Sequence, residues 1–212
     1  MQTLEIIPYS SALQPYFESI NKAWVTKYFT LESFDIDQLE HPEETILAQG
    51  GEIIFAKLGE EILGTVALIP KEAGDWEMIK MGVKESAQGK GVGFALANEF
   101  ASRGWSVLIS GRTMPAIDDA LNRIRERTPN AQVAGAIVDV SSFASVQALW
   151  ATAVAQFGPI GREEGGSLVA VVLDLAADAE GFTFLGASLG HAGAAARKHQ
   201  TRQQIGVAHR ER

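Results

Sequence analysis

Cysteine is absent from all 212 residues of this chain. Its absence excludes disulfide bonds and thiolate metal sites. The four histidines are too scattered along the sequence to indicate a zinc cluster. We therefore expect no metal site.

A basic excess and a long apolar run are also missing. The net charge of −8 argues against a nucleic-acid partner, which normally contacts a stripe of Lys and Arg. No apolar run approaches the roughly 20 residues that a membrane span requires, and no basic, apolar leader precedes the first acidic residues. With 46% hydrophobic residues, the composition is that of a folded, soluble protein, which we expect to be cytoplasmic.

Arginine is missing from the first hundred residues. Residues 1–100 hold 7 Lys and 16 Asp plus Glu, a net charge of −9, whereas residues 101–212 hold 10 Arg, 1 Lys and 10 acidic residues, a net charge of +1. Alanine rises from 9 to 21 between the same two parts. Chance or a domain boundary would explain this exchange, but we favour a junction of two sequences of different origin near residues 94–103.

Residues 76–105, WEMIKMGVKESAQGKGVGFALANEFASRGW, are the stretch around which the rest is organised. Their pattern predicts a strand from Trp76 to Val83, a loop with three glycines between residues 89 and 93, and a helix from Phe94 to Ser102. A helix that starts after such a loop directs unpaired N–H groups and the positive end of its dipole at the loop. The sequence therefore predicts an anion site, best suited to a pyrophosphate.

The residues before this stretch predict a strand, helices and a hairpin. In order, these are a strand at 4–8, a helix at 12–24 with Ser10 or Ser11 as cap, an aromatic-rich loop at 27–34, a short helix from 35, and hairpin strands at 52–58 and 62–69. We expect Tyr16, Phe17, Ile20 and Trp24 to share one face of the first helix.

Residues 1–104 resemble the first half of the GNAT acetyltransferases. The phrases GGEIIFAKLGEEILGTVALI and KMGVKESAQGKGVG match in order and spacing, and the second is similar to the family's Q/R-x-x-G-x-G/A loop, which holds the pyrophosphate of acetyl-CoA. The resemblance implies that the strand before the loop pairs with the pantetheine arm, and that an aromatic segment near residues 24–34 lines a site for a small-molecule or peptide amine. The implied cofactor residues are Met81, Gly82, Val83, Gln88, Gly89, Lys90, Gly91, Val92 and Gly93.

Acetyl transfer to an amine needs a base for the ammonium proton, a donor for the oxyanion and an acid for the leaving thiolate. Glu77, on the strand that leads to the loop, is the candidate base, directly or through water. A solvated carboxylate at a strand edge is the alternative interpretation, and Asp75 is a weaker candidate. The tyrosine that often serves as the acid in this family has no counterpart after Tyr28, so we expect acetyl-CoA binding with activity reduced or absent.

From Ser86 a second resemblance begins. The residues S-A-Q-G-K-G-V-G are similar to the T-G-x-x-x-G-x-G loop of short-chain dehydrogenases, with Ala87 in place of the first glycine. WSVLISGRT, AGAIVDVSSFASVQALW and AVAQFGPI resemble later strands and a helix of that family, over residues 86–160. One loop therefore fits two families.

The second resemblance implies a nucleotide site of its own. Arg112 would face a 2′-phosphate and Asp139 with Val140 would edge the adenine, which implies NADP rather than NAD. The dehydrogenase family also needs an N-N-A-G strand end, a catalytic serine and a Y-x-x-x-K pair. None of these is present in the sequence, so we do not expect a dehydrogenase reaction from this chain alone.

The later residues predict strands that alternate with helices, as in a parallel sheet. The strands are expected at 105–110, 132–138 and within 165–176, and the helices at 115–127 and at 141–157 with Ser141 or Ser142 as cap.

We predict an α/β fold in which a GNAT-like N-terminal half-sheet is continued by Rossmann-type βαβ units. The expected parts are an acyl-CoA-binding half at 1–104, a Rossmann segment at 105–178, and a glycine-rich loop with a basic tail at 179–212. An acetyl-CoA-dependent N-acetyltransferase is the favoured function. An NADP-binding dehydrogenase fragment and a non-catalytic or artificial recombinant nucleotide-binding protein are the alternatives. The sequence does not indicate the oligomeric state.

Overall fold

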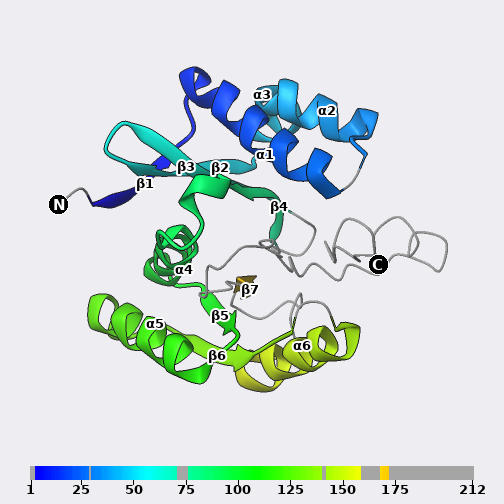
Figure 1. The fold of residues 1–212 in the computed structure, drawn as a ribbon. Helices are drawn as coiled ribbons and strands as arrows, with labels where there is room; N and C mark the ends of the chain where they lie inside the picture. Colours follow the sequence, from blue (N-terminus) through cyan, green and yellow to red (C-terminus); the bar gives the residue numbers. More distant parts are fainter. Residues whose placement is uncertain (1–2, 29, 71–75, 140–141, 159–167, 172–212) are drawn as a thin grey trace.

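A computed structural model describes residues 3–28, 30–70, 76–139, 142–158 and 168–171. They form a mixed α/β fold with two sheets (Figure 1). The strands are β1 (Leu4–Pro8), β2 (Glu52–Leu58), β3 (Glu61–Pro70), β4 (Trp76–Val83), β5 (Ser106–Gly111), β6 (Val133–Ile137) and β7 (Leu168–Val171). The helices are α1 (Gln14–Tyr28), α2 (Ser33–Glu40), α3 (Pro42–Thr45), α4 (Val92–Ser102), α5 (Met114–Arg127) and α6 (Phe143–Phe157), with 3-10 turns η1 (Ser11–Leu13), η2 (Leu47–Gln49) and η4 (Glu85–Ala87).

The first sheet has the order β1-β2-β3-β4, and each neighbouring pair is antiparallel. β2 and β3 form the predicted hairpin, with Gly59 in the turn at a φ of 60°. β2 is buried on both faces. Because successive side chains of a strand point to opposite sides, Ile53 and Phe55 point into one core and Ile54 and Ala56 into another.

Helices α1, α2 and α3 cover one face of this sheet (Figure 1). Phe17 and Ile20 of α1 are buried there, as predicted. Tyr16 lies at the margin of the same helix face and is 40% exposed. Adjacent residues of a helix point about 100° apart at 3.6 residues per turn, and burial of Phe17 turns Tyr16 towards solvent.

A bulge interrupts the pairing of β4 with β3. Thr65 faces Gly82 and Ala67 faces Ile79, so one residue of β3 stands opposite both Lys80 and Met81. Lys80 has a left-handed backbone with a φ of 48°, the only such non-glycine residue in the described part of the chain. A bulge bends its strand, so β4 changes direction shortly before the glycine loop.

The second sheet has the order β6-β5-β7, and β5 pairs in parallel with both neighbours. Val107 and Ile109 of β5 pack in the core that α5 enters, whereas Leu108 packs with Leu149 of α6 and with Val138. α5 and α6 therefore cover opposite faces of β5, as in Rossmann-type βαβ connections.

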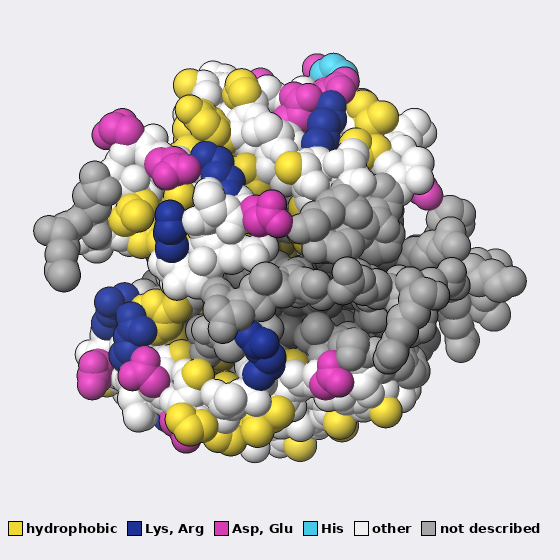
Figure 2. All heavy atoms as spheres, in the orientation of Figure 1, with side chains coloured by type: hydrophobic (Ala, Val, Ile, Leu, Met, Phe, Trp, Pro, Cys, Tyr) yellow, Lys and Arg dark blue, Asp and Glu magenta, His cyan; other side chains and the backbone are white. Residues whose placement is uncertain are grey.

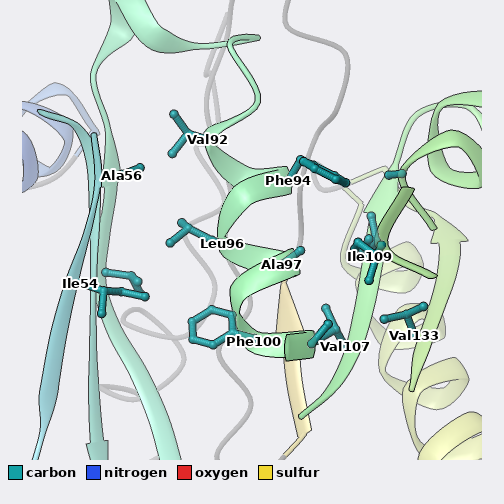
Figure 3. Packing of buried hydrophobic residues seen from close by; sticks show 14 of the residues in the cluster. Ile54, Ala56, Val92, Phe94, Leu96, Ala97, Phe100, Val107, Ile109 and Val133 are labelled. Atoms are coloured by element: carbon teal, nitrogen blue, oxygen red, sulfur yellow. The ribbon is translucent and has the colours of Figure 1, made fainter. Parts of the chain in front are cut away.

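α4 lies between the two sheets. Figure 3 shows Val92, Leu96 and Phe100 on the side of α4 that faces the antiparallel sheet, and Phe94 and Ala97 on the side that faces β5. The first three residues are spaced four apart and so form one helix face. A single hydrophobic core cluster contains residues of both sheets and of α4.

An ion-pair cluster lies where α4 ends. Arg103, the first arginine of the chain, donates from Nη1 to both carboxylate oxygens of Glu52 in β2, each at 2.8 Å, and from Nε to Glu99 at 2.8 Å. Arg103 belongs to the part of the chain that contains arginine, and β2 belongs to the part without arginine. The contact of Arg103 with Glu52 therefore joins the two parts.

The predicted order of elements is confirmed in the described residues, with shifts at several ends. α1 continues to Tyr28 and α2 begins at Ser33, so the expected loop at 27–34 is shorter than predicted. Ser10 occupies the cap position before η1, but its side chain makes no capping hydrogen bond. The helix after the glycine loop begins at Val92, two residues before the predicted start.

In the second half, Ser142 is the cap of α6, because its Oγ accepts a hydrogen bond from the Ser145 amide at 3.3 Å. β7 lies within the strand expected at 165–176; the other residues of that range and the expected loop and tail at 179–212 lie outside the described residues. No helix in the described ranges combines the length and apolar character needed to cross a membrane.

Candidate functional site

The loop between β4 and α4 turns on two left-handed glycines. Gly89 has a φ of 74°, and Gly91, the N-cap of α4, has a φ of 82° and a ψ of 16°. Residues with a Cβ adopt this conformation only at a cost of roughly 1–2 kcal/mol. A Cβ built on Gly91 would point into open space, so backbone conformation and not packing requires glycine there.

The loop uses some of its amides internally and leaves others free. The amides of Gln88 and Lys90 donate to the carbonyls of Glu85 and Ala87, at 3.3 and 3.1 Å. Within the described residues, the remaining amides from residue 89 to residue 94 donate to no protein acceptor. These free donors are the amides of Gly89, Gly91, Val92, Gly93 and Phe94.

The free amides and the helix dipole make this loop electropositive. The aligned peptide dipoles place about half an elementary charge at a helix N-terminus. Lys90 is exposed and forms no ion pair in the described part of the chain. An anion placed against Gly91 and the first turn of α4 would meet several donors and no carboxylate from that turn.

The outer edge of β4 lies directly before this loop. β4 pairs with β3 along one edge, and no described strand pairs with the other. Among the described residues, Met81, Gly82 and Val83 therefore have a strand neighbour on one side only, along an edge that runs into the loop. Gly82 is glycine for a different reason, because a Cβ there would approach Cγ2 of Ile20 in α1 to 2.9 Å.

An ion pair holds α2 against the bulge of β4. Nζ of Lys80 lies 2.5 Å from Oδ1 of Asp35, and 11% and 16% of these side chains are exposed. The ring of Phe34, which is 57% exposed, lies 5.8 Å from the same Nζ. Nothing in the local sequence pattern indicates the left-handed bulge at Lys80 or its partner 45 positions earlier.

The structure describes only the backbone of Glu77, the candidate base. Glu77 stands in β4 opposite Ile69, three residues before Lys80. Its side chain, and the whole of Asp75, lie outside the described residues.

Tyr9 has contacts of its own elsewhere in the fold. Its hydroxyl donates to Glu43 at 3.3 Å and its ring stacks on Phe55. Burial, together with the Glu43 carboxylate, raises the pKa of Tyr9 to about 12.

The residues of the second predicted site lie at the carboxyl ends of β5 and β6. Arg112 follows β5 and is exposed, and the amide of Asp139, after β6, donates to Oγ of Ser145 at 2.9 Å. Val140 lies outside the described residues. Ser110, at the end of β5, is fully buried and its hydroxyl has no hydrogen-bond partner in the described part. The described residues hold no group of three or more acidic or histidine side chains able to bind a metal ion.

Two protein families match different parts of the chain. The profile of the acetyltransferase (GNAT) family matches residues 13–107, and the profile of the short chain dehydrogenases matches residues 86–162. The matches overlap over residues 86–107, which contain the glycine loop and α4. The chain is therefore similar to GNAT acetyltransferases over one segment and to short-chain dehydrogenases over the next, which is consistent with a chimera. No curated protein matches it.

Three of the solved structures that the chain matches are described as acetyltransferases, and each has low sequence identity to it. A GNAT-family acetyltransferase from Staphylococcus aureus Mu50 has 17% identity and a TM-score of 0.42, over 71% of this chain and 82% of its own. A predicted acetyltransferase with acetyl-CoA from Clostridium acetobutylicum has 12% identity and a TM-score of 0.36, over 71% and 88%. A Bacillus subtilis acetyltransferase in complex with CoA has 17% identity and a TM-score of 0.32, over 72% and 74%.

Proposed function

We propose that this protein binds acetyl-CoA on its glycine loop and transfers the acetyl group to the amine of a small molecule or peptide. The observation that carries the proposal is the left-handed turn at Gly91, which leaves five amides of the loop and the first turn of α4 free to bind a pyrophosphate. The match of the acetyltransferase profile to residues 13–107 supports the same assignment.

The open edge of β4 supports a place for the pantetheine arm. This arm carries amide groups, which pair with a strand edge as the backbone of an added strand does. If the pyrophosphate lies at Gly91, an arm that follows β4 passes Val83, Gly82 and Met81. It then brings the thioester towards the bulge at Lys80. The cofactor would thus lie along the unpaired edge of β4 and against the free amides of the glycine loop.

The reaction forms a C–N bond and breaks a C–S bond. A neutral amine attacks the thioester carbonyl, and the ammonium proton must first pass to a base, for which we propose Glu77. The leaving thiolate takes up a proton. Since no tyrosine follows Tyr28, we expect this last step to lack a tyrosine donor and turnover to be slow.

An NADP-binding protein is the second candidate, favoured by the parallel order β6-β5-β7 and by the dehydrogenase match. The pairing of the strand before the loop argues against NADP binding. A dinucleotide-binding loop follows a strand of the parallel sheet itself. Here that strand is β4, which pairs antiparallel with β3, and no described pairing joins it to β5. We therefore rank this candidate below acetyl-CoA.

Thermal unfolding with four ligands tests the proposal. We expect acetyl-CoA and coenzyme A to raise the melting temperature, because a ligand at a hundredfold excess over its Kd adds about 2.7 kcal/mol to folding stability. NADPH and NADH should have little effect. A rise with NADPH alone would reverse the ranking, and no rise with any of the four would leave the non-catalytic alternative.

Acetyl transfer itself can be measured by release of the coenzyme A thiol in the presence of a panel of amines. The protein has no cysteine, so a thiol-specific reagent detects only the product. We expect slow, amine-dependent release, abolished when Glu77→Gln removes the base while leaving acetyl-CoA affinity unchanged. If Glu77→Gln does not change the rate at which the coenzyme A thiol is released, Glu77 is not the base.

A further inference from the structure

Two arginines of α5 stack on one aromatic ring of α4. Cζ of Arg123 lies 4.1 Å, and Cζ of Arg127 5.2 Å, from the ring centre of Phe94. A guanidinium over the face of an aromatic ring is attracted by the ring's π electrons, which helps to hold two like charges side by side. Figure 2 shows Lys and Arg side chains beside a hydrophobic side chain over the left end of α5.

The charges of this arginine pair, Arg123 and Arg127, are poorly neutralised. Arg123 faces Asp119 at 3.4 Å, but 50% and 69% of these side chains are exposed, and such a surface pair contributes little. Arg127 forms no ion pair with any described residue. Arg125, between them, points elsewhere and donates to the carbonyl of Val133 at 3.1 Å. The pair thus presents two planar donor groups with spare hydrogen-bonding capacity.

The arginine pair lies beside the loop, on the side away from the antiparallel sheet. Phe94 is the third residue of α4, and its ring points away from that sheet (Figure 3). In coenzyme A the pyrophosphate lies between the pantetheine arm and an adenosine whose ribose carries a phosphate monoester. If the pantetheine arm follows β4 on one side of the loop, the ribose phosphate lies on the other side of the loop, next to α5.

We propose that Arg123 and Arg127 form a subsite for a phosphate monoester on the ribose of the bound nucleotide. The inference rests on the proposed function, in which this nucleotide is coenzyme A. A phosphate monoester carries close to two negative charges at neutral pH, and the guanidinium fork matches its oxygens in bidentate fashion. The dehydrogenase-like segment then supplies ligand-binding residues to a site whose loop and strand belong to the acetyltransferase-like segment.

Calorimetric titrations with coenzyme A and with 3′-dephospho-coenzyme A test this subsite. We expect the protein to bind coenzyme A about tenfold or more tightly than the dephosphorylated form, a difference of about 1.4 kcal/mol. The double variant R123Q/R127Q should reduce this ratio to near one, while its affinity for the dephosphorylated form stays unchanged. R125Q removes the same charge from the same helix without facing the site, and should keep the full ratio.

Folding is checked by circular dichroism, and R123K/R127K serves as a second variant. It keeps the charge but not the fork, so an intermediate ratio is expected. Equal affinities for the two ligands, or a ratio that R123Q/R127Q leaves unchanged, would overturn the subsite alone. Absence of coenzyme A binding would overturn the proposed function as well. The 2′-phosphate of NADP has the same chemistry, so discrimination between NADPH and NADH without coenzyme A binding would keep the subsite but assign it to a dinucleotide.

Discussion

Gly91 is the residue on which the proposed cofactor site depends most. Its left-handed conformation lets the chain enter α4 directly from the loop, so that the amides of the first turn point outwards. Gly104, just beyond the other end of the helix, has nearly the same conformation, with φ values of 82° and 84°, and neither glycine has an atom near its Cβ direction. The two glycines therefore form a matched pair for mutagenesis.

Gly91→Ala and Gly104→Ala should each lower the free energy of unfolding by roughly 1–2 kcal/mol, the cost of a left-handed alanine. Only Gly91→Ala should also weaken coenzyme A binding, because its methyl group enters the space before the free amides. Urea unfolding and calorimetric titration of both variants separate the two effects. Equal loss of affinity in both would mean that the loop conformation has no specific part in binding.

Tyr9 is expected to make the stability depend on pH in the alkaline range. Burial and the Glu43 carboxylate raise its pKa from 10 to about 12 in the folded state, so folding favours the protonated phenol. This contribution is fully present below pH 10 and is lost as the pH rises towards 12. Urea unfolding between pH 9 and about 12 should therefore show a smaller decline for Tyr9→Phe than for the natural chain.

Glu43→Gln is the companion variant. Burial is the larger cause of the raised pKa of Tyr9, and it remains in this variant. Glu43→Gln should therefore retain most of the alkaline decline in the free energy of unfolding that Tyr9→Phe removes. A decline of the same size in the natural chain and in Tyr9→Phe would assign the effect to other groups.

At the scale of elements, α5 lies so close to β6 that only glycine fits at residue 135. A Cβ there would lie 2.2 Å from Cγ2 of Ile117 and 3.2 Å from Cδ1 of Leu121. Gly135→Ala should therefore destabilise the protein by about 1–3 kcal/mol, as overpacking does. Ile117→Ala removes the clashing atom, so the double variant should be less destabilised than the two single changes together predict. Simple additivity in chemical unfolding would contradict this packing.

Sequence patterns predicted elements where the signal is local. The hairpin of β2 and β3 was predictable from two apolar runs and a glycine turn, and the start of α6 from a serine cap. The glycine loop and the helix after it were predictable because the glycines precede an apolar run, and the anion site there stays a prediction. The exact start of α4 was not, since Val92 and Gly93 fit a loop and a first helical turn equally well.

Features that depend on distant contacts were not predictable from the sequence. The bulge at Lys80 depends on how β4 pairs with β3, and its ion pair depends on where α2 lies. The stacking of Arg123 and Arg127 on Phe94 likewise requires α5 to return beside α4. Neither arrangement has a periodic or motif-like signal along the chain.

At the scale of the whole molecule, α4 gives both sheets a common core. The same 11-residue helix packs against β2 through one face and against β5 through the other. Both families place a glycine loop and a helix after a strand, so a junction within α4 satisfies the local requirements of each. The Arg103 contacts to Glu52 then tie the two parts together at the end of the helix.

Phe100→Ala should destabilise both sheets at once. Phe100 is fully buried, and its ring stacks on Trp105 at a centroid distance of 5.1 Å. Loss of a buried phenylalanine costs about 3–5 kcal/mol. In urea, far-ultraviolet circular dichroism and tryptophan fluorescence should report a single shifted transition for this variant. Two separate transitions would mean that the sheets fold independently.

The most direct test of the central claim is a nuclear magnetic resonance titration of the ¹⁵N-labelled protein with coenzyme A. The free amides of Gly89, Gly91, Val92, Gly93 and Phe94 should show the largest shift changes, followed by the backbone amides of β4 from residue 81 to residue 83. The amides after β5 and β6, near Arg112 and Asp139, should change little. Changes confined to those residues, with the glycine loop unaffected, would contradict the account.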